Sequence, residues 1–329
     1  MRTLVGTLLR TAPLIHQAST PSGIIKRAKY CLRGLVLAPY TMEWFEVLKA
    51  PELAFIVKNH PALFQKLQRP YLNCTLGTTQ RLEALKQHYQ FVRDHFSPAL
   101  IEEVYAPGGK LLAELPVKEV GTLELRLCCN RMQKEGDLTI NLSLKKSQQP
   151  IASLSFSVWK CAMGYKEIFV GGLQGDKATG EDTVVAVTRG LYGLRPKALL
   201  VYMLQQLAGC WKIDRIRAVN DEMHIYRHFQ SRRNVNASYD AFWVECGGTP
   251  VTNGNFDLPI AFVPREISTI RVNKRQQYKR RYAMLAGIEE QVQASLSSNG
   301  EMPVQVAGQS LATSSARPQA MNYLPARAA

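Results

Sequence analysis

The stretch TRGLYGLRPK, which ends at Lys197, combines basic side chains with glycines directly before a long apolar run. A helix that begins at Pro196 would leave its first backbone amides without partners, and no Ser, Thr, Asp or Asn lies between Arg189 and Arg195 to cap them. The cations would also lie at the positive end of the helix dipole, where an anion is stabilising. The candidate residues for binding a phosphate or carboxylate are therefore Arg189, Gly193, Arg195 and Lys197. The alternative is a plain tight turn whose cations point into water.

The sequence GGLQG contains a second set of candidate ligand-binding residues, Gly171, Gly172, Gln174 and Gly175. It ends a predicted strand, and ligands of mixed sheets collect at the carboxyl ends of strands where the topology switches. Glycines there would expose backbone groups, and the amide of Gln174 could donate or accept a hydrogen bond. A bulge or closely packed strand end is the alternative.

His224 and Tyr226 are candidate catalytic residues. If they follow a strand on the first turn of a helix, they would face the cleft and could act as general acid or base. His224 and His228 also have the spacing of metal ligands, but no third ligand stands nearby in the sequence. We therefore predict no metal site.

The elements that must position these residues begin with helices between residues 40 and 105. Apolar and polar residues then alternate in three runs, 123–127, 138–144 and 152–158, which predict an antiparallel meander whose strands each have one wet face. A fourth strand is predicted at 165–174. The first thirty residues have no clear periodicity.

A helix is predicted over 196–208, followed by a short strand in 212–220, a helix in 221–233 and an aromatic strand at 239–246. Strand, helix and strand in this order imply a right-handed parallel crossover. We therefore expect an α+β fold with a mixed sheet, an antiparallel meander followed by a parallel crossover, with N-terminal helices. The expected parts are an N-terminal helical region (1–110), the mixed-sheet domain (111–265), a basic helix (266–290) and a disordered tail (291–329).

The formal charge of +15 indicates that the chain attracts anionic partners, such as phosphates, anionic lipid headgroups or acidic acyl carriers. Seven basic residues against Glu266 alone lie between Arg265 and Arg281. This segment could bind nucleic acid or anionic lipid; the alternative is a docking helix with a solvated basic side.

Scattered cysteines without CxxC spacing, a short and interrupted N-terminal apolar run, and the lack of any long uncharged apolar stretch predict a cytoplasmic protein that does not span a membrane. GxSxG, HExxH, GK[ST] loops and GxGxxG are all absent from the sequence. Serine hydrolases, zincins, P-loop NTPases and Rossmann oxidoreductases therefore lose support.

Five segments together resemble the VirK/YbjX family of Gram-negative bacteria: GGLQG, TRGLYGLRPKALL, IRAVN, FDLPI and KRQQYKRRYAML. The resemblance covers residues 25–290. It implies a cytoplasmic accessory factor linked to virulence, to correct surface display of outer-membrane proteins and to resistance against cationic antimicrobial peptides.

The predicted order of elements is also similar to the GNAT type of acyl-CoA N-acyltransferase. In that fold the loop before the central helix binds the pyrophosphate of CoA through a Q/R-x-x-G-x-G/A pattern. This chain departs from the pattern, because Arg189 and Gly193 are one residue too far apart and Arg195 replaces the last small residue. The resemblance implies acyl-CoA or an acyl carrier protein as cofactor and an acyl transfer to an amine. The alternative is a non-enzymatic basic protein that binds nucleic acid, anionic lipid or a secretion partner.

Overall fold

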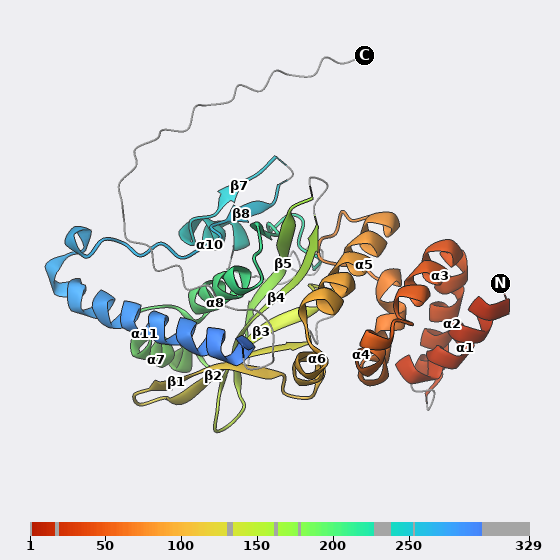
Figure 1. Cartoon of the computed structure of the whole chain (residues 1–329), viewed down its shortest axis with the longest axis horizontal. Helices are drawn as coiled ribbons and strands as arrows, with labels where there is room; N and C mark the ends of the chain where they lie inside the picture. The colour runs from red at the N-terminus through yellow and green to blue at the C-terminus, as the bar shows by residue number, and fades with distance from the viewer. Residues whose placement is uncertain are drawn as a thin grey trace, which may run out of the picture.

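The computed structural model describes residues 2–16, 20–129, 134–160, 164–176, 179–226, 238–252 and 254–297. Its N-terminal part is helical, and the first thirty residues, for which no periodicity was predicted, contain two helices. The helices of this part are α1 (Arg2–Ile15), α2 (Pro21–Val36), α3 (Ala38–Val47), η1 (Pro51–Leu53), α4 (Ala54–Asn59), η2 (Pro61–Gln68), α5 (Thr78–His95) and α6 (Pro98–Tyr105). Figure 1 shows α1, α2 and α3 together at one end of the molecule.

The centre of the molecule is a mixed sheet with the strand order β1-β2-β3-β4-β5-β6-β8-β7. The antiparallel meander is β1 (Lys110–Val117), β2 (Gly121–Cys129), β3 (Leu138–Leu144), β4 (Pro150–Lys160) and β5 (Lys166–Gly175). It therefore includes the four predicted strands and one more, β1.

The parallel junction lies between β5 and β6 (Arg215–Ala218). The chain crosses over through α7 (Glu181–Gly190) and α8 (Pro196–Cys210), and α8 packs against β3, β4 and β5. The predicted fold class, a mixed α+β sheet with N-terminal helices, is confirmed. Figure 1 shows α8 between the sheet and the long helix α11 (Val272–Ser297).

The predicted crossover after β6 is wrong. The aromatic segment is a helix, α10 (Tyr239–Glu245), because the Ser238 side chain accepts the amide of Ala241 at 3.2 Å and caps it. Residues 221–226 form turns instead of the start of a helix, and the rest of that predicted helix lies outside the described residues. The last strands, β7 (Thr249–Pro250) and β8 (Phe256–Leu258), pair antiparallel, with β8 next to β6.

The predicted wet faces of the meander are also wrong, since consecutive residues of β3 and β4 are buried. Consecutive burial means that both faces of these strands are covered. The polar side chains that were expected to face solvent form hydrogen bonds with one another inside the protein. The hydroxyls of Thr139 and Ser155 lie 3.2 Å apart, and Ser157 donates to Asp137 at 3.1 Å.

Asp137 is the centre of a buried polar network. Its carboxylate pairs with the ammonium group of Lys66 at 2.6 Å and accepts hydrogen bonds from the hydroxyls of Tyr71 and Tyr89. Burial alone would raise the pKa of Asp137, but Lys66, helped by the hydrogen bond from Tyr71, holds it at about 2. The network joins η2 and α5 to the sheet.

The basic segment contains η3 (Ile267–Thr269) and the first part of α11. The helix packs against β1 and α8 through Leu285, Ile288, Val292 and Leu296, and it continues past residue 290, where a disordered tail was predicted. The remainder of that tail lies outside the described residues. No described helix combines the length and the apolar character that crossing a membrane requires.

Candidate functional site

A pocket of about 750 Å³ lies beside the carboxyl end of β5, between the α7–α8 loop and α10. We call it the switch pocket. Apolar walls come from Ile151, Ala152, Val184, Val185 and Phe242. The structure brings five of the predicted site residues into its lining, namely Gly175, Arg189, Gly193, Arg195 and Lys197.

The N-terminus of α8 opens into this pocket without a cap. Arg195 is the N-cap residue, and no side chain accepts a hydrogen bond there. Pro196 occupies the first helical position and has no amide proton. In the described part of the chain, no group accepts a hydrogen bond from the backbone amides of Lys197 and Ala198. The helix therefore presents two open donors and the positive end of its dipole.

The cations of the switch pocket differ in their partners. Arg195 forms an ion pair with Glu245 and lies 5.6 Å over the ring of Phe242. Burial, and then the charge of Arg195, lowers the pKa of Lys197. Neither Lys197 nor Arg189 has a carboxylate partner in the described part of the chain. Lys197 and Arg189 therefore bring positive charge to the pocket without a described carboxylate to neutralise it.

Gly193 has a structural reason to be glycine. Its φ of +78° follows Tyr192 at +54°, and this left-handed turn ends α7, with the Gly193 amide donating to the carbonyl of Thr188 at 2.8 Å. A Cβ at Gly193 would lie 2.6 Å from the side chain of Gln277. Arg281 of α11 donates to the carbonyl of Tyr192 at 2.7 Å. The basic helix therefore holds the loop that carries the candidate anion ligands.

The other predicted residues gather around Glu135, which the sequence analysis did not single out. Gly171 is the extra residue of a bulge in β5, and a Cβ there would lie 2.2 Å from the carbonyl oxygen of Glu135. A Cβ on Gly172 would lie 2.5 Å from the Glu135 carboxyl carbon. Both glycines are buried in a closely packed bulge, which is the geometry predicted as the alternative to a ligand-binding strand end.

Glu135 joins Gln174 and His224 in a buried polar cluster. The Gln174 amide donates to Glu135 Oε1 at 2.6 Å, and His224 Nε2 lies 3.1 Å from the same oxygen. Glu135 and His224 are 1% and 2% exposed. His224 was predicted to lie on a helix, but it pairs with Asn73 in an isolated β-bridge instead. An imidazole held by a carboxylate is the arrangement that general bases use.

Two tyrosines surround this cluster. The ring of Tyr239 lies 5.0 Å from the ring of His224, and its hydroxyl accepts the Leu173 amide at 3.1 Å. Tyr226 is half-buried with its ring 5.8 Å from that of His224. Burial raises the pKa of both tyrosines. Tyr226 therefore lies beside His224, as the sequence spacing required. Sequence reasoning could not find Glu135, because it stands far from both in the chain and belongs to no motif.

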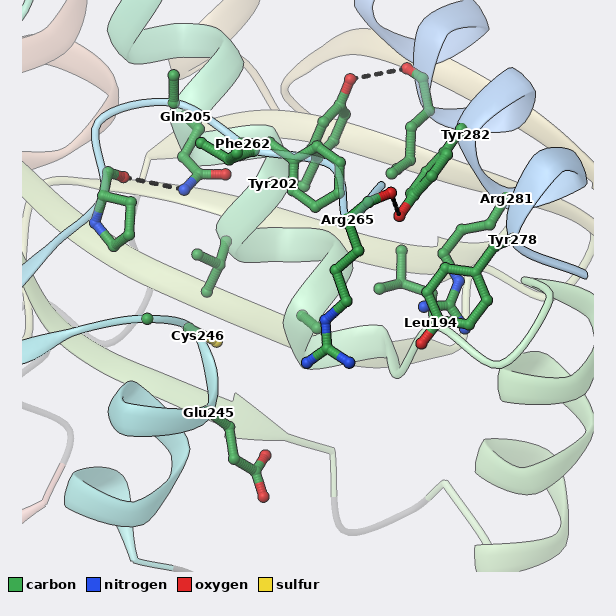
Figure 2. Close-up of a pocket in the computed structure, with 17 residues that line it drawn as sticks. Leu194, Tyr202, Gln205, Glu245, Cys246, Phe262, Arg265, Tyr278, Arg281 and Tyr282 are labelled. Atoms are coloured by element: carbon green, nitrogen blue, oxygen red, sulfur yellow. Dashed lines mark hydrogen bonds between the residues drawn. The ribbon is translucent and has the colours of Figure 1, made fainter. Parts of the chain in front are cut away.

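A second pocket, of about 420 Å³, lies between α8 and α11, and we call it the aromatic groove. Figure 2 shows Tyr202, Phe262, Tyr278 and Tyr282 around it, with Arg265 reaching across. Two of the three tyrosine hydroxyls are used by the fold, since Tyr202 donates to the carbonyl of Leu285 and Tyr282 to that of Arg265. Glu245 lines both pockets, so the aromatic groove adjoins the switch pocket.

No group of three or more His, Cys, Asp or Glu side chains in the described ranges could hold a metal ion. His228, the second member of the predicted His pair, lies outside those ranges.

These features define an α+β protein with a cation-lined pocket beside the carboxyl end of β5. The chain belongs to the family described as "Protein of unknown function (DUF535)", whose model matches residues 21–294. It is 34% identical over 273 residues to the Escherichia coli (strain K12) protein named "Uncharacterized protein YbjX", covering 81% of this chain and 82% of the relative. An uncharacterized Haemophilus influenzae protein is 23% identical over 211 residues, which is 64% of this chain and 69% of that one. The VirK/YbjX resemblance is confirmed.

Two solved mutant forms of a cAMP-binding acyltransferase from Mycobacterium smegmatis also overlay on the chain. Their TM-scores are 0.27 and 0.28, with 13% and 11% identity. Each overlay covers 72% of this chain, and 66% and 65% of the two solved chains. The chain thus spans about two thirds of their length, and the overlays are too loose to support an argument.

Proposed function

We propose that this protein is an N-acyltransferase that takes an acyl group from a phosphopantetheine thioester, either acyl-CoA or an acyl carrier protein, and transfers it to an amine. The observation that carries the proposal is the uncapped N-terminus of α8, which meets Lys197 and Arg189 in the switch pocket. In the GNAT fold the corresponding loop binds the pyrophosphate of CoA. The pocket offers a phosphate open amides, unpaired cations and the helix dipole.

The order of elements supports the same proposal. A meander, a crossover through α7 and α8, a parallel strand, a helix and closing strands follow one another here, which is the GNAT order with α7 as an addition. The correction of residues 239–246 from strand to helix α10 supplies the helix that this order requires. The spacing between Arg189 and Gly193 still departs from the motif of that fold, and the left-handed turn that ends α7 accounts for the extra residue.

In the proposed reaction the amine attacks the thioester carbonyl, the carbon–sulfur bond breaks, and the thiolate leaves. The amine must lose a proton, and His224 is the residue we assign to accept it and pass it to the thiolate. His224 lines neither the switch pocket nor the aromatic groove, and its Nδ1 accepts the Tyr226 amide at 3.4 Å, so the proposal requires the imidazole to leave this hydrogen bond when the donor binds. Glu135, 3.1 Å from His224 Nε2, would orient the imidazole and stabilise its protonated form. Tyr226, next to His224, is the second acid/base candidate.

The aromatic groove suits the acyl part of the donor. Its volume of about 420 Å³ and its walls of aromatic and aliphatic carbon are typical of sites for apolar groups. Since the relatives and the VirK/YbjX resemblance concern Gram-negative bacteria, we extend the proposal to a cytoplasmic role in maintaining the cell envelope, in virulence and in resistance to antimicrobial peptides.

Thermal shift measurements with CoA, acyl-CoA and acyl carrier protein test the proposal. A ligand at 100 times its dissociation constant stabilises the folded state by about 2.7 kcal/mol. We expect the double variant R189S/K197M to lose this shift. The matched control K58S/K146S removes two exposed lysines outside the switch pocket and should keep it. An unchanged shift in R189S/K197M, or no shift with any thioester in the unmodified protein, would refute the proposal.

A second candidate function is binding of nucleic acid by α11. Arg271, Lys274, Lys279 and Arg280 are exposed on or beside this helix, whereas Arg275 and Arg281 bond to backbone carbonyls. Phosphate contacts would give an affinity that falls steeply with salt. Titration of single-stranded RNA at two salt concentrations, with K279S/R280S for comparison, tests it; salt-independent binding argues against it.

A further inference from the structure

Helix α2, at the end of the molecule away from α11, has an apolar face that no described residue covers (Figure 1). Val36, Leu32 and Ile24 are 73%, 63% and 60% exposed. With Ile25, Ala28 and Leu35 they recur at spacings of three and four, which puts them on one side of the helix. We call these six residues the α2 stripe. Exposed apolar patches of this kind mark interaction surfaces.

The opposite side of α2 holds the helix in place. A Cβ on Gly34 would lie 2.6 Å from Leu8 of α1, so the two helices cross closely. The hydroxyls of Tyr30 and Thr11 lie 2.7 Å apart in the same interface. The α2 stripe is therefore displayed on a packed helix, and its exposure follows from the fold.

Basic residues flank the stripe and no acidic residue accompanies them. Residues 1–42 contain six Lys and Arg, and the first acidic residue of the chain is Glu43. Lys26, Lys29 and Arg33 recur along α2 at spacings of three and four, next to the stripe. An apolar face bordered by lysines and arginines is the pattern of helices that lie in the surface of an anionic bilayer.

The same cations line a small pocket of about 130 Å³ between α2 and η2, together with His16, Gln68 and Arg69. No carboxylate lines it, and no described carboxylate pairs with Lys26, Lys29, Arg33 or Arg69. Burial, and then the charge of Arg33, lowers the pKa of Arg69. The buried Nε2 atom of Gln68 has no hydrogen-bond acceptor among the residues that the structure describes. Unpaired cations and an unused donor around one cavity are what an oxyanion would satisfy.

We propose that this end of the protein docks on the surface of an anionic lipid bilayer, with the α2 stripe against the acyl chains and a lipid phosphate in the pocket between α2 and η2. A second copy of the chain is a poorer occupant, because it would bring two sets of cations together without a carboxylate. The α11 surface is a separate basic region at the other end of the molecule (Figure 1).

Sedimentation of the full chain with phosphatidylcholine vesicles, with and without phosphatidylglycerol, tests the proposal. We expect binding only to the anionic vesicles, weakened by added salt. The variants I24S/L32S/V36S and K29S/R33S should each bind at least about tenfold more weakly. The control V244S/V272S replaces two apolar residues away from α2, one on α10 and one at the start of α11, 59% and 77% exposed, and should bind like the unmodified protein.

Equal binding by I24S/L32S/V36S, or a loss confined to V244S/V272S, would overturn the assignment to α2. Binding to neutral vesicles as strong as to anionic ones would overturn the role of the cations. A dimer in analytical ultracentrifugation that I24S/L32S/V36S abolishes would identify a second copy as the occupant. Circular dichroism and the melting temperature show whether the variants fold, and the salt dependence of the unmodified protein tests the electrostatic part independently of any variant.

Discussion

The buried imidazole of His88 makes the stability of this protein depend on pH in a defined window. His88 is 0% exposed, its Nδ1 accepts the amide of Val158 at 3.1 Å, and its Nε2 has no partner among the described residues. Burial is the largest influence on its pKa, and with the charge of Lys66 it outweighs Asp137 and lowers the pKa of His88 to about 4. The folded protein therefore keeps His88 neutral.

The magnitude follows from linkage. In the unfolded chain His88 takes up a proton near its ordinary pKa of 6.5, whereas the folded protein does so only near 4. The unfolded state thus binds more protons within this window, and stability falls as pH falls from about 6.5 to 4. Lowering the pH from 7 to 5 should remove about 2 kcal/mol through this residue alone.

The substitution His88→Gln isolates this contribution. The amide oxygen of glutamine can accept the Val158 amide, and glutamine does not titrate. Urea unfolding at pH 7 and pH 5 should show the unmodified protein losing about 2 kcal/mol more than H88Q. Above pH 7 the two proteins should share the same pH dependence. Equal losses between pH 7 and pH 5 would show that the reasoning about His88 is wrong.

Three further substitutions test packing and capping by urea unfolding. Lys66→Met leaves the Asp137 carboxylate buried without its counter-ion and should cost about 3–5 kcal/mol; a cost below about 1 kcal/mol would contradict the network. Ser97→Ala removes the side-chain cap of α6 and should cost about 1 kcal/mol, whereas no cost would mean that another group caps the helix. Gly171→Ala puts a Cβ against the backbone of Glu135 and should cost at least about 1–3 kcal/mol, and a neutral result would show that the bulge relaxes.

The sequence predicted the strands and the helix whose apolar residues recur with a regular period. Alternating leucines in 123–127 and 138–144 identified strands, and Pro196 with its apolar stripe identified α8. The prediction failed at 239–246, where aromatic residues favoured a strand. The local signal for this helix was Ser238, whose side chain caps it, and Asp221 adds a contact from a distant part of the chain by accepting the Tyr239 amide at 2.9 Å. No local pattern reveals such a contact.

The candidate site divides in the same way. Four of the predicted residues that line the switch pocket lie within nine positions of one another, so the sequence showed them as one motif. The fifth, Gly175, lines the pocket from the end of β5. Glu135 is brought to Gln174 and His224 only by the pairing of strands and loops, and it had no sequence signal. The prediction that each meander strand has a solvent-exposed face failed for a similar reason, because the helices that cover these strands are remote in the sequence.

The ion pair between Arg195 and Glu245 gives the switch pocket a resident negative charge of its own. Under the proposed function, an anion that bonds to Arg195 would displace this carboxylate, whereas Lys197 and Arg189 have no described carboxylate to displace. The side chains of Arg195 and Glu245 are 54% and 53% exposed, so water screens the ion pair and its displacement costs little. We therefore expect Glu245 to weaken anion binding only modestly.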